Sequence, residues 1–296
     1  MRLIDNVAIV GVGLIGGSFG MALKKRGLAE RVIGIGRNPE RLQKAVDLGA
    51  IDEWMTDIEA GVRDADLVYI STPVGLEVHF IRQAVMAAPN GCIITDAGST
   101  KGEICRQVDK IVRKDVHFVG GHPMAGSEMT GVEAANPELF VNATYVLTPT
   151  SATSPEAMAV VQKLAEAIGS KVIIMDPEAH DWCVAAVSHL PHIIAAALVS
   201  MAHEYSLKNP QVFNLVAGSF RDMTRVASSS PVLWRDICLT NVEEIQKAAE
   251  SFKQHLTEGL RTLESNDGEA FMKWFGSAKQ IRDSIFRPAQ ENKDSS

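Results

Sequence analysis

The sequence predicts an α/β protein in which a doubly wound sheet is followed by an all-α region. Strand-like and helix-like apolar segments alternate from Val7 to Met175, as in a mainly parallel sheet. After Asp176-Pro177 no further strand pattern occurs, and long apolar helix patterns follow. We therefore expect an N-terminal Rossmann-type domain over residues 1–176 and a helical substrate-binding and dimerisation domain over residues 177–296.

A glycine turn follows the first expected strand, in the stretch VAIVGVGLIGG at 7–17. In a G-x-G-x-x-G turn, Gly11 permits the sharp bend, Gly13 lets the backbone approach a pyrophosphate, and Gly16 lets helix and strand pack closely. The helix that starts here offers free N–H groups to the phosphates. We expect cofactor contacts from Gly11, Gly13, Leu14, Ile15, Gly16, Arg37, Ser71, Thr72 and Pro73.

The remaining elements are read from hydrophobic periodicity. Further strands are expected at 31–35, 66–71, 92–95, 117–119, 144–147 and 171–175, and the helices between them at 14–25, 39–48, 74–88, 104–113 and 155–168. Later helices are expected at 178–205 with a bend at Pro191, at 211–226, from Pro231 to about residue 263 with Ser230 as N-cap, and at 268–286. The polar tail at 291–296 is expected to be disordered.

Composition argues against several classes of protein. The 296 residues carry a formal net charge of −7, which argues against general attraction to nucleic acid or anionic membranes. The four cysteines lie far apart without metal-ligand spacing, and the first residues show no signal-peptide or transit-peptide pattern, so we expect reduced thiols, no metal site and a cytoplasmic protein. The most apolar stretch, 183–202, contains polar residues and is expected to be a buried helix rather than a membrane span.

The apolar helical region needs a partner surface. We expect a homodimer with two-fold symmetry through this domain. The alternative is that these helices bury their apolar faces on the chain's own sheet domain.

The sequence leaves the choice between NAD and NADP open. An NAD site usually has an acidic residue at the end of the second strand, where this chain has Gly36 and Arg37. Arg37 can pair with a 2′-phosphate, which favours NADP or the use of both cofactors. The alternative is that Arg37 is a solvated loop residue, or one stacked over the adenine.

Two loops at expected strand ends carry candidate catalytic residues. His122 lies in GGHPMAGSE, held by glycines and a proline, and an imidazole can accept a proton at neutral pH. The alternative is a histidine that only hydrogen-bonds its own loop. Ser99 lies in DAGSTKG, where it is positioned to share a hydrogen bond with His122 and a substrate hydroxyl.

Two helical motifs supply candidate substrate contacts. VSHLPH puts Ser188 and His192 one helical turn apart, and GSFRDMTR puts Arg221 and Arg225 one turn apart. A guanidinium matches a carboxylate in a bidentate pair, although Asp222 and Arg225 also have the spacing of an intrahelical ion pair.

Taken together, these stretches resemble the prephenate/arogenate dehydrogenase (TyrA, cyclohexadienyl dehydrogenase) family. The motifs DAGSTKG, GGHPMAGSE, VSHLPH and GSFRDMTR carry the resemblance, which runs from the glycine turn to about residue 286. It implies oxidative decarboxylation of prephenate, arogenate or both, to 4-hydroxyphenylpyruvate or tyrosine, with hydride transfer to NAD(P)⁺ in tyrosine biosynthesis. We expect neither a mutase segment before Val7 nor a C-terminal regulatory domain.

The resemblance also implies roles for individual residues. His122 matches the histidine that bonds the ring hydroxyl and accepts its proton, and Ser99 matches the serine that orients this hydroxyl. His192 matches a histidine that binds substrate, and Arg225 matches the arginine that holds a substrate carboxylate.

Four further positions match the family's substrate region. Ser188 and Ser127 match secondary substrate contacts, and relatives often have threonine in place of the latter. Asp222 and Trp234 match positions near the cleft entrance. Trp234 could contribute to the cleft of its own subunit or to that of the partner subunit. The alternative is that it is only an aromatic residue of the subunit interface.

Two other functions are compatible with a dinucleotide-binding chain. A β-hydroxyacid dehydrogenase would depend on a lysine in the helical half, but Lys208 lies beside Asn209-Pro210 without a matching pattern. A non-catalytic dinucleotide-binding sensor would bind NAD(P) without turnover, and it gives no reason for the histidines and arginines above.

Overall fold

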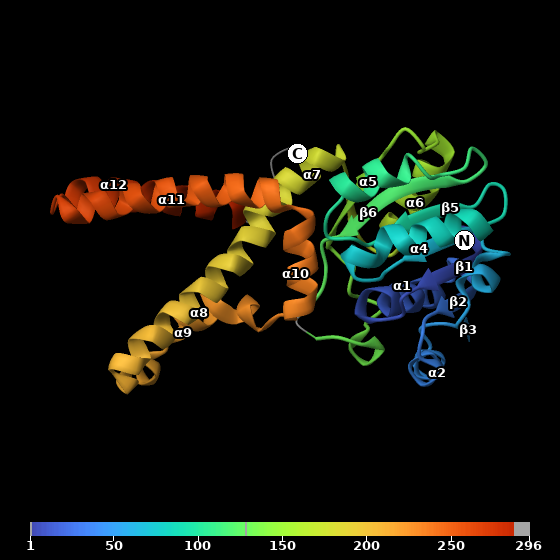
Figure 1. Cartoon of the computed structure of the whole chain (residues 1–296), viewed down its shortest axis with the longest axis horizontal. Coiled ribbons are helices and arrows are strands. Elements are labelled where there is room, and N and C mark those ends of the chain that lie inside the picture. The colour runs from blue at the N-terminus through green and yellow to red at the C-terminus, as the bar shows by residue number, and fades with distance from the viewer. Residues whose placement is uncertain (1, 128, 287–296) are drawn as a thin grey trace, which may run out of the picture. The chain divides into compact units, whose positions relative to one another are not determined.

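The computed structural model describes residues 2–127 and 129–286 (Figure 1). It divides into two compact units, Met1–Ile245 and Gln246–Ser296. The first unit contains the sheet and the helices up to α10, and it holds every candidate site residue. The tail at 291–296, expected to be disordered, lies outside the described residues.

Eight strands form one sheet in the order β3-β2-β1-β4-β5-β6-β7-β8 (Figure 1). They are β1 (Ile4–Val10), β2 (Ala29–Ile35), β3 (Glu53–Met55), β4 (Leu67–Ile70), β5 (Ile93–Asp96), β6 (His117–Pro123), β7 (Thr144–Thr148) and β8 (Lys171–Ile174). All neighbouring pairs are parallel except β6 and β7. The expected mainly parallel, doubly wound sheet is confirmed, whereas the short edge strand β3 was not expected.

Helices cover both faces of this sheet. They are α1 (Leu14–Lys25), α2 (Pro39–Asp47), α3 (Ile58–Val62), α4 (Val74–Ala87), α5 (Gly102–Val108) and α6 (Pro155–Ala167). One apolar core joins the sheet to α1, α2 and α6 through residues such as Phe19 and Leu164. The other joins it to α3, α4 and α5 through residues such as Ile81 and Val108. The carboxyl ends of the parallel strands therefore meet at one edge, where open α/β sheets bind ligands.

The long helix expected over 178–205 consists of three segments. These are α7 (Pro177–Val184), a π-helical turn (Ala185–His189) and α8 (Leu190–Lys208). A π turn bonds residue i to i+5 and so accommodates one more residue than an α turn. Pro191 lies in the first turn of α8, directly after the π turn, and it has no N–H to donate to the preceding helical turn.

Two other predictions of a single continuous helix are wrong. The stretch 211–226 contains a 3₁₀ segment (Pro210–Leu215), α9 (Gly218–Thr224) and a second 3₁₀ segment (Arg225–Ser228). The helix that starts at Pro231 is α10 (Pro231–Thr240), and α11 (Val242–Glu264) begins after it. Asn241 separates the two because its side chain donates to the Asp181 carbonyl and contacts His189. The last helix, α12 (Gly268–Phe286), is as expected.

Much of the apolar surface of α8 is exposed. Pro177–Lys208 is long and apolar enough to cross a membrane by length and composition, and only 28% of its most apolar window is buried within the described chain. The expectation of a buried helix is therefore met only in part. Large exposed apolar side chains on this stretch are Trp182, Val187, Ile193, Val199, Met201, Tyr205 and Leu207.

Candidate active site

The glycine turn has the geometry that a dinucleotide requires. Gly11 has φ of 95°, and a Cβ there would lie 2.4 Å from the Ser71 carbonyl oxygen. A Cβ on Gly16 would lie 2.2 Å from the Gly11 oxygen, so this position also excludes a side chain. Gly13 has no atom within 4 Å of its missing Cβ, and no side chain caps α1 there. The open space and uncapped helix N-terminus fit a pyrophosphate.

A cavity of about 280 Å³ lies beside this turn. Leu14 and Ile15 from α1 line it, together with Ser71, Thr72 and Pro73 at the carboxyl end of β4. The structure therefore brings together the two expected cofactor-binding stretches, which are far apart in the sequence.

Arg37 lies outside this cavity. It is exposed in the loop between β2 and α2, and it is not among the residues that line the cavity. Its neighbour Asn38 caps α2 by accepting a hydrogen bond from the Arg41 N–H. The position where an NAD site usually has a carboxylate is thus occupied by Gly36 and a cation.

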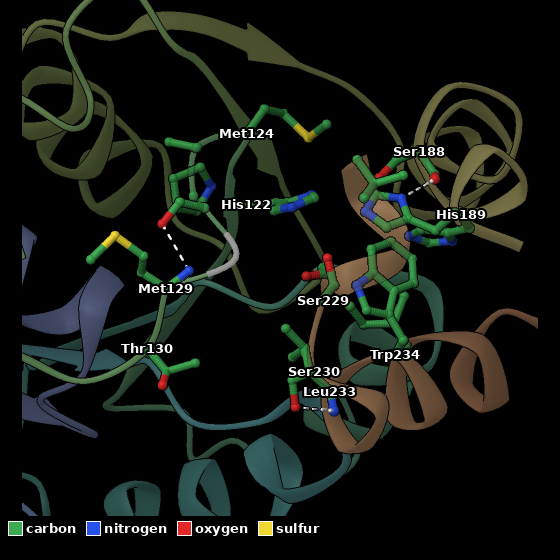
Figure 2. A pocket seen from close by; sticks show the side chains of 18 of the residues that line it. His122, Met124, Met129, Thr130, Ser188, His189, Ser229, Ser230, Leu233 and Trp234 are labelled. Carbon is green, nitrogen blue, oxygen red and sulfur yellow. Dashed lines mark hydrogen bonds between the residues drawn. The ribbon is translucent and has the colours of Figure 1, made fainter. Parts of the chain in front are cut away.

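A second cavity, of about 380 Å³, adjoins the first (Figure 2). His122, at the end of β6, projects into it from the sheet, and Ser188, His189 and Trp234 face it from the helical side. His122 and Ser99 line both cavities. A small molecule in one cavity and a dinucleotide in the other would therefore meet along a shared wall that includes these two residues.

His192 has a restricted ring orientation. Its imidazole stacks on Trp234 of the same chain, with ring centroids 3.6 Å apart and an interplanar angle of 23°. Its Nδ1 bonds the Ser188 carbonyl oxygen at 2.8 Å, so Nδ1 is the donor. Burial, and then the nearby Arg225 charge, lower the pKa of His192 although the Ser188 carbonyl raises it. The neutral ring keeps Nε2 as its free acceptor.

The other predicted substrate contacts divide into two groups. Arg225, Ser127 and Ser188 line the second cavity, and the Ser127 hydroxyl accepts a hydrogen bond from the Met129 N–H. Asp222 and Arg221 are exposed and are not among the lining residues. Of the two arginines in GSFRDMTR, the structure therefore brings only Arg225 to the cavity.

Sequence reasoning missed a histidine and a carboxylate behind His122. His122 Nδ1 lies 2.8 Å from His180 Nε2, and His180 Nδ1 lies 2.8 Å from Asp181 Oδ1. All three side chains are buried. The signal was the adjacent pair His180-Asp181 on α7, but nothing in the sequence links this pair to a strand 58 residues earlier.

A second missed group is a buried charge cluster below the loops of Ser99 and His122. Asp96 accepts hydrogen bonds from the Gly98 N–H at 2.9 Å and the Gly121 N–H at 3.0 Å. Lys101 forms an ion pair with Asp96, and its Nζ donates to the Gly121 carbonyl at 2.8 Å. Burial lowers the pKa of Lys101, but the surrounding acidic groups, Asp96 first, together outweigh burial, and the net shift is upward. The cluster fixes both loops to one another.

Glu77 lies beside this cluster, in the first turn of α4. Its side chain is fully buried, and its two carboxyl oxygens have no hydrogen-bond partner among the described residues. Burial, and then the charge of Asp96, raise the pKa of Glu77 well above its ordinary value. Both causes favour the protonated form of this carboxyl.

Among residues 2–127 and 129–286, no group of three or more His, Cys, Asp or Glu side chains is arranged to hold a metal ion. The four cysteines are free.

Family models match nearly the whole chain. Residues 19–174 match the model described as "Prephenate dehydrogenase, nucleotide-binding domain", and residues 176–277 match "Prephenate dehydrogenase, dimerization domain".

Known proteins align over almost the full length. The chain is 38% identical to a prephenate dehydrogenase of Bacillus subtilis over 95% of its length and 76% of that protein. It is 33% identical to a cyclohexadienyl dehydrogenase of Zymomonas mobilis, over 95% of its length and 96% of that protein. The crystal structure of an Aquifex aeolicus prephenate dehydrogenase with hydroxyphenyl propionate and NAD⁺ superposes with a TM-score of 0.89 at 37% identity, covering 95% of this chain and 98% of that one.

Proposed function

This chain belongs to the prephenate/arogenate dehydrogenase family, and from that premise we propose which of its residues carry out the reaction. The protein is an NAD(P)-dependent dehydrogenase that catalyses an oxidative decarboxylation in tyrosine biosynthesis. A β-hydroxyacid dehydrogenase or a non-catalytic sensor is therefore no longer needed as an explanation.

His122 is the general base and Ser99 orients the reacting hydroxyl. Bound NAD(P)⁺ would supply the hydride acceptor in the first cavity. As hydride leaves the ring carbon, His122 Nε2 takes the hydroxyl proton; the ring carboxylate leaves as carbon dioxide, and the ring becomes aromatic. The phenolate oxygen then takes the proton back from His122. The reaction thus balances without net proton release from the enzyme.

One observation supports this assignment: His122 and Ser99 are among the residues that line both cavities. Hydride transfer and proton abstraction must occur at the same substrate carbon and its oxygen, so the base has to face both ligands. The test is steady-state turnover of prephenate and arogenate by wild type, Ser99→Ala and His122→Asn, followed as reduced nicotinamide. If His122→Asn keeps the wild-type rate, His122 is not the base.

Arg225 and His192 bind the substrate. Arg225 supplies a cation for a carboxylate, and His192 offers a neutral acceptor nitrogen beside the stacked Trp234. Ser188 and Ser127 line the same cavity and add hydroxyl contacts, and Trp234 lines it as well. Asp222, which is exposed and not among the lining residues, is assigned to the cavity entrance from the family resemblance. Prephenate, arogenate or both are substrates. A matrix of both substrates against NAD⁺ and NADP⁺ decides this choice.

Arg37 tunes the choice of cofactor. With Gly36 in place of a carboxylate, nothing at this position repels a 2′-phosphate, and the exposed guanidinium is available to pair with one. We expect NADP⁺ to be used as well as NAD⁺. Arg37→Ala should then lower kcat/KM for NADP⁺ more than for NAD⁺. A wild-type enzyme that prefers NAD⁺ by a large factor would contradict this role.

The helical region forms a homodimer. We assign residues 1–176 to cofactor binding and residues 177–296 to substrate binding and dimerisation, in line with family models that meet between residues 174 and 176. The exposed apolar side chains of α8 supply the contact surface, because apolar patches of this kind mark interfaces. The free thiols agree with a cytoplasmic enzyme. Sedimentation equilibrium of wild type and Met201→Glu tests the dimer.

A further inference from the structure

His122 is the first of three buried side chains in a row, His122, His180 and Asp181, here termed the histidine–carboxylate network. The two nitrogen contacts, His122 to His180 and His180 to Asp181, are both 2.8 Å long. Asp181 Oδ1 also accepts the Lys101 N–H at 2.7 Å, and Oδ2 accepts the Gly102 N–H at 2.8 Å. Asp181 is thus held by backbone donors at the start of α5.

The hydrogen atoms in this network can be assigned by elimination. A carboxylate that accepts several N–H groups is ionised and can only accept, so His180 Nδ1 must be the donor to Asp181. Neutral His180 then has an unprotonated Nε2, which must accept from His122 Nδ1. Neutral His122 is left with an unprotonated Nε2, the nitrogen available to the cavity.

We propose that His180 and Asp181 are positioning residues that hold His122 in the tautomer whose Nε2 is the base. This rests on the proposed function of His122. When Nε2 takes the hydroxyl proton, Nδ1–H stays donated to His180, and the Asp181 carboxylate lies two hydrogen bonds away to stabilise the imidazolium. The same proton returns to the phenolate oxygen, and the network ends as it began.

The surroundings explain why His122 needs this support. Burial first, then His180, Lys101 and His189, lower the pKa of His122 well below its ordinary value. Lys101 is paired with Asp96, and burial lowers the pKa of His189 to about 4, so His189 is neutral at pH 7. Asp181 is therefore the anion that the hydrogen bonds connect to His122, and it offsets part of the cost of forming a buried cation.

A pair of substitutions separates the tautomer role from a merely structural one. His180→Gln keeps an acceptor oxygen for His122 Nδ1–H and a donor for Asp181. His180→Leu has neither. His180→Leu should lower kcat by ~10-fold or more, up to the ~10²–10⁴-fold that a general base contributes. His180→Gln should recover most of this loss, with KM and NADH affinity close to wild type in both variants. His117→Gln, in the same strand as His122 and outside both cavities, is the matched control.

A measurement without substrate keeps the inference apart from the proposed function. Nitrogen-15 NMR of histidine-labelled apoenzyme should show His122 protonated at Nδ1 in wild type and His180→Gln, and shifted toward Nε2–H in His180→Leu. A wild-type His122 protonated at Nε2, or a His180→Leu enzyme with wild-type kcat, would overturn the inference. If neither prephenate nor arogenate is turned over by wild type, the proposed function fails, while the NMR result still decides the tautomer.

Discussion

Replacing Gly98 with alanine tests how closely the loop of Ser99 is packed on the buried acid Glu77. An added Cβ would lie 2.1 Å from Glu77 Oε2 and 2.9 Å from Asp96 Oδ2. Contacts under 3.0 Å require something to shift, and the Glu77 carboxyl is fully buried in α4. The backbone of Gly98 has no left-handed φ, so the penalty is steric rather than conformational.

The expected loss follows from this contact. Overpacking a well-packed interior costs about 1–3 kcal/mol. Replacing a glycine with alanine also stabilises the fold by about 0.4–1 kcal/mol, because it reduces the conformational entropy of the unfolded chain. Gly98→Ala should therefore lose roughly 1–2 kcal/mol, or about 2–8 °C in Tm. It should also lower kcat, because Ser99 is the next residue.

The assay is a double-mutant cycle by thermal and urea unfolding at pH 7. Glu77→Ala removes the shorter of these two contacts and leaves the one to Asp96 Oδ2 at 2.9 Å, so adding Gly98→Ala to Glu77→Ala should cost much less than adding it to wild type. The coupling between the two changes should be about 1–2 kcal/mol. Gly276→Ala, where no atom lies within 4 Å of the missing Cβ, should be at least as stable as wild type. Additive losses at positions 77 and 98 would refute the steric argument.

Four further predictions concern catalysis and pH. His122→Asn should lower kcat by about 10²–10⁴-fold with cofactor affinity nearly unchanged, measured by turnover and NADH titration. Arg225→Gln should mainly raise KM, because it removes a ground-state carboxylate contact; a pure kcat defect would point to a transition-state role. Because folding raises the pKa of Glu77, its contribution to stability is fully present below pH 4.5 and is lost as pH rises. Glu77→Gln should therefore have a higher Tm than wild type from pH 5 to pH 8. The effect of pH through His189 is the opposite, because folding lowers its pKa from 6.5 to about 4. Up to ~3 kcal/mol of folding stability is therefore lost as pH falls through that window. His189→Gln should lessen this loss, measured by unfolding curves at acid pH.

The features that could be read from the sequence are those set by neighbouring residues. The glycine turn was predictable because Gly11, Gly13 and Gly16 act within one turn of chain. The position of His122 at a strand end was predictable because an apolar run leads directly into its glycines. Short-range rules of this kind also gave most strands and helices of the sheet domain in chain order, although not β3 and α3.

The features that could not be predicted depend on contacts between distant residues. Asp181 reaches the Lys101 N–H across 80 residues, and His180 reaches His122 across 58. Glu77 is a charged residue in a first helical turn, and its burial beside Gly98 depends on the loop after β5, which is distant in sequence. Asn241 gave no helix-stop signal strong enough to end α10, because its partners lie on α7 and the π turn.

The π-helical turn at Ala185–His189 sets the frame in which the residues after it are counted. His180 precedes it and supports the base, whereas His192 follows it and stacks on Trp234. The turn already holds one residue more than an α turn, so inserting a further residue there would rotate everything downstream by about 100° around the axis, whereas deleting one would let the turn close as ordinary α-helix. After the insertion, His192 would leave its stacking partner while His180 stayed in place. This short segment should therefore tolerate a change of side chain or the loss of one residue far better than an added residue.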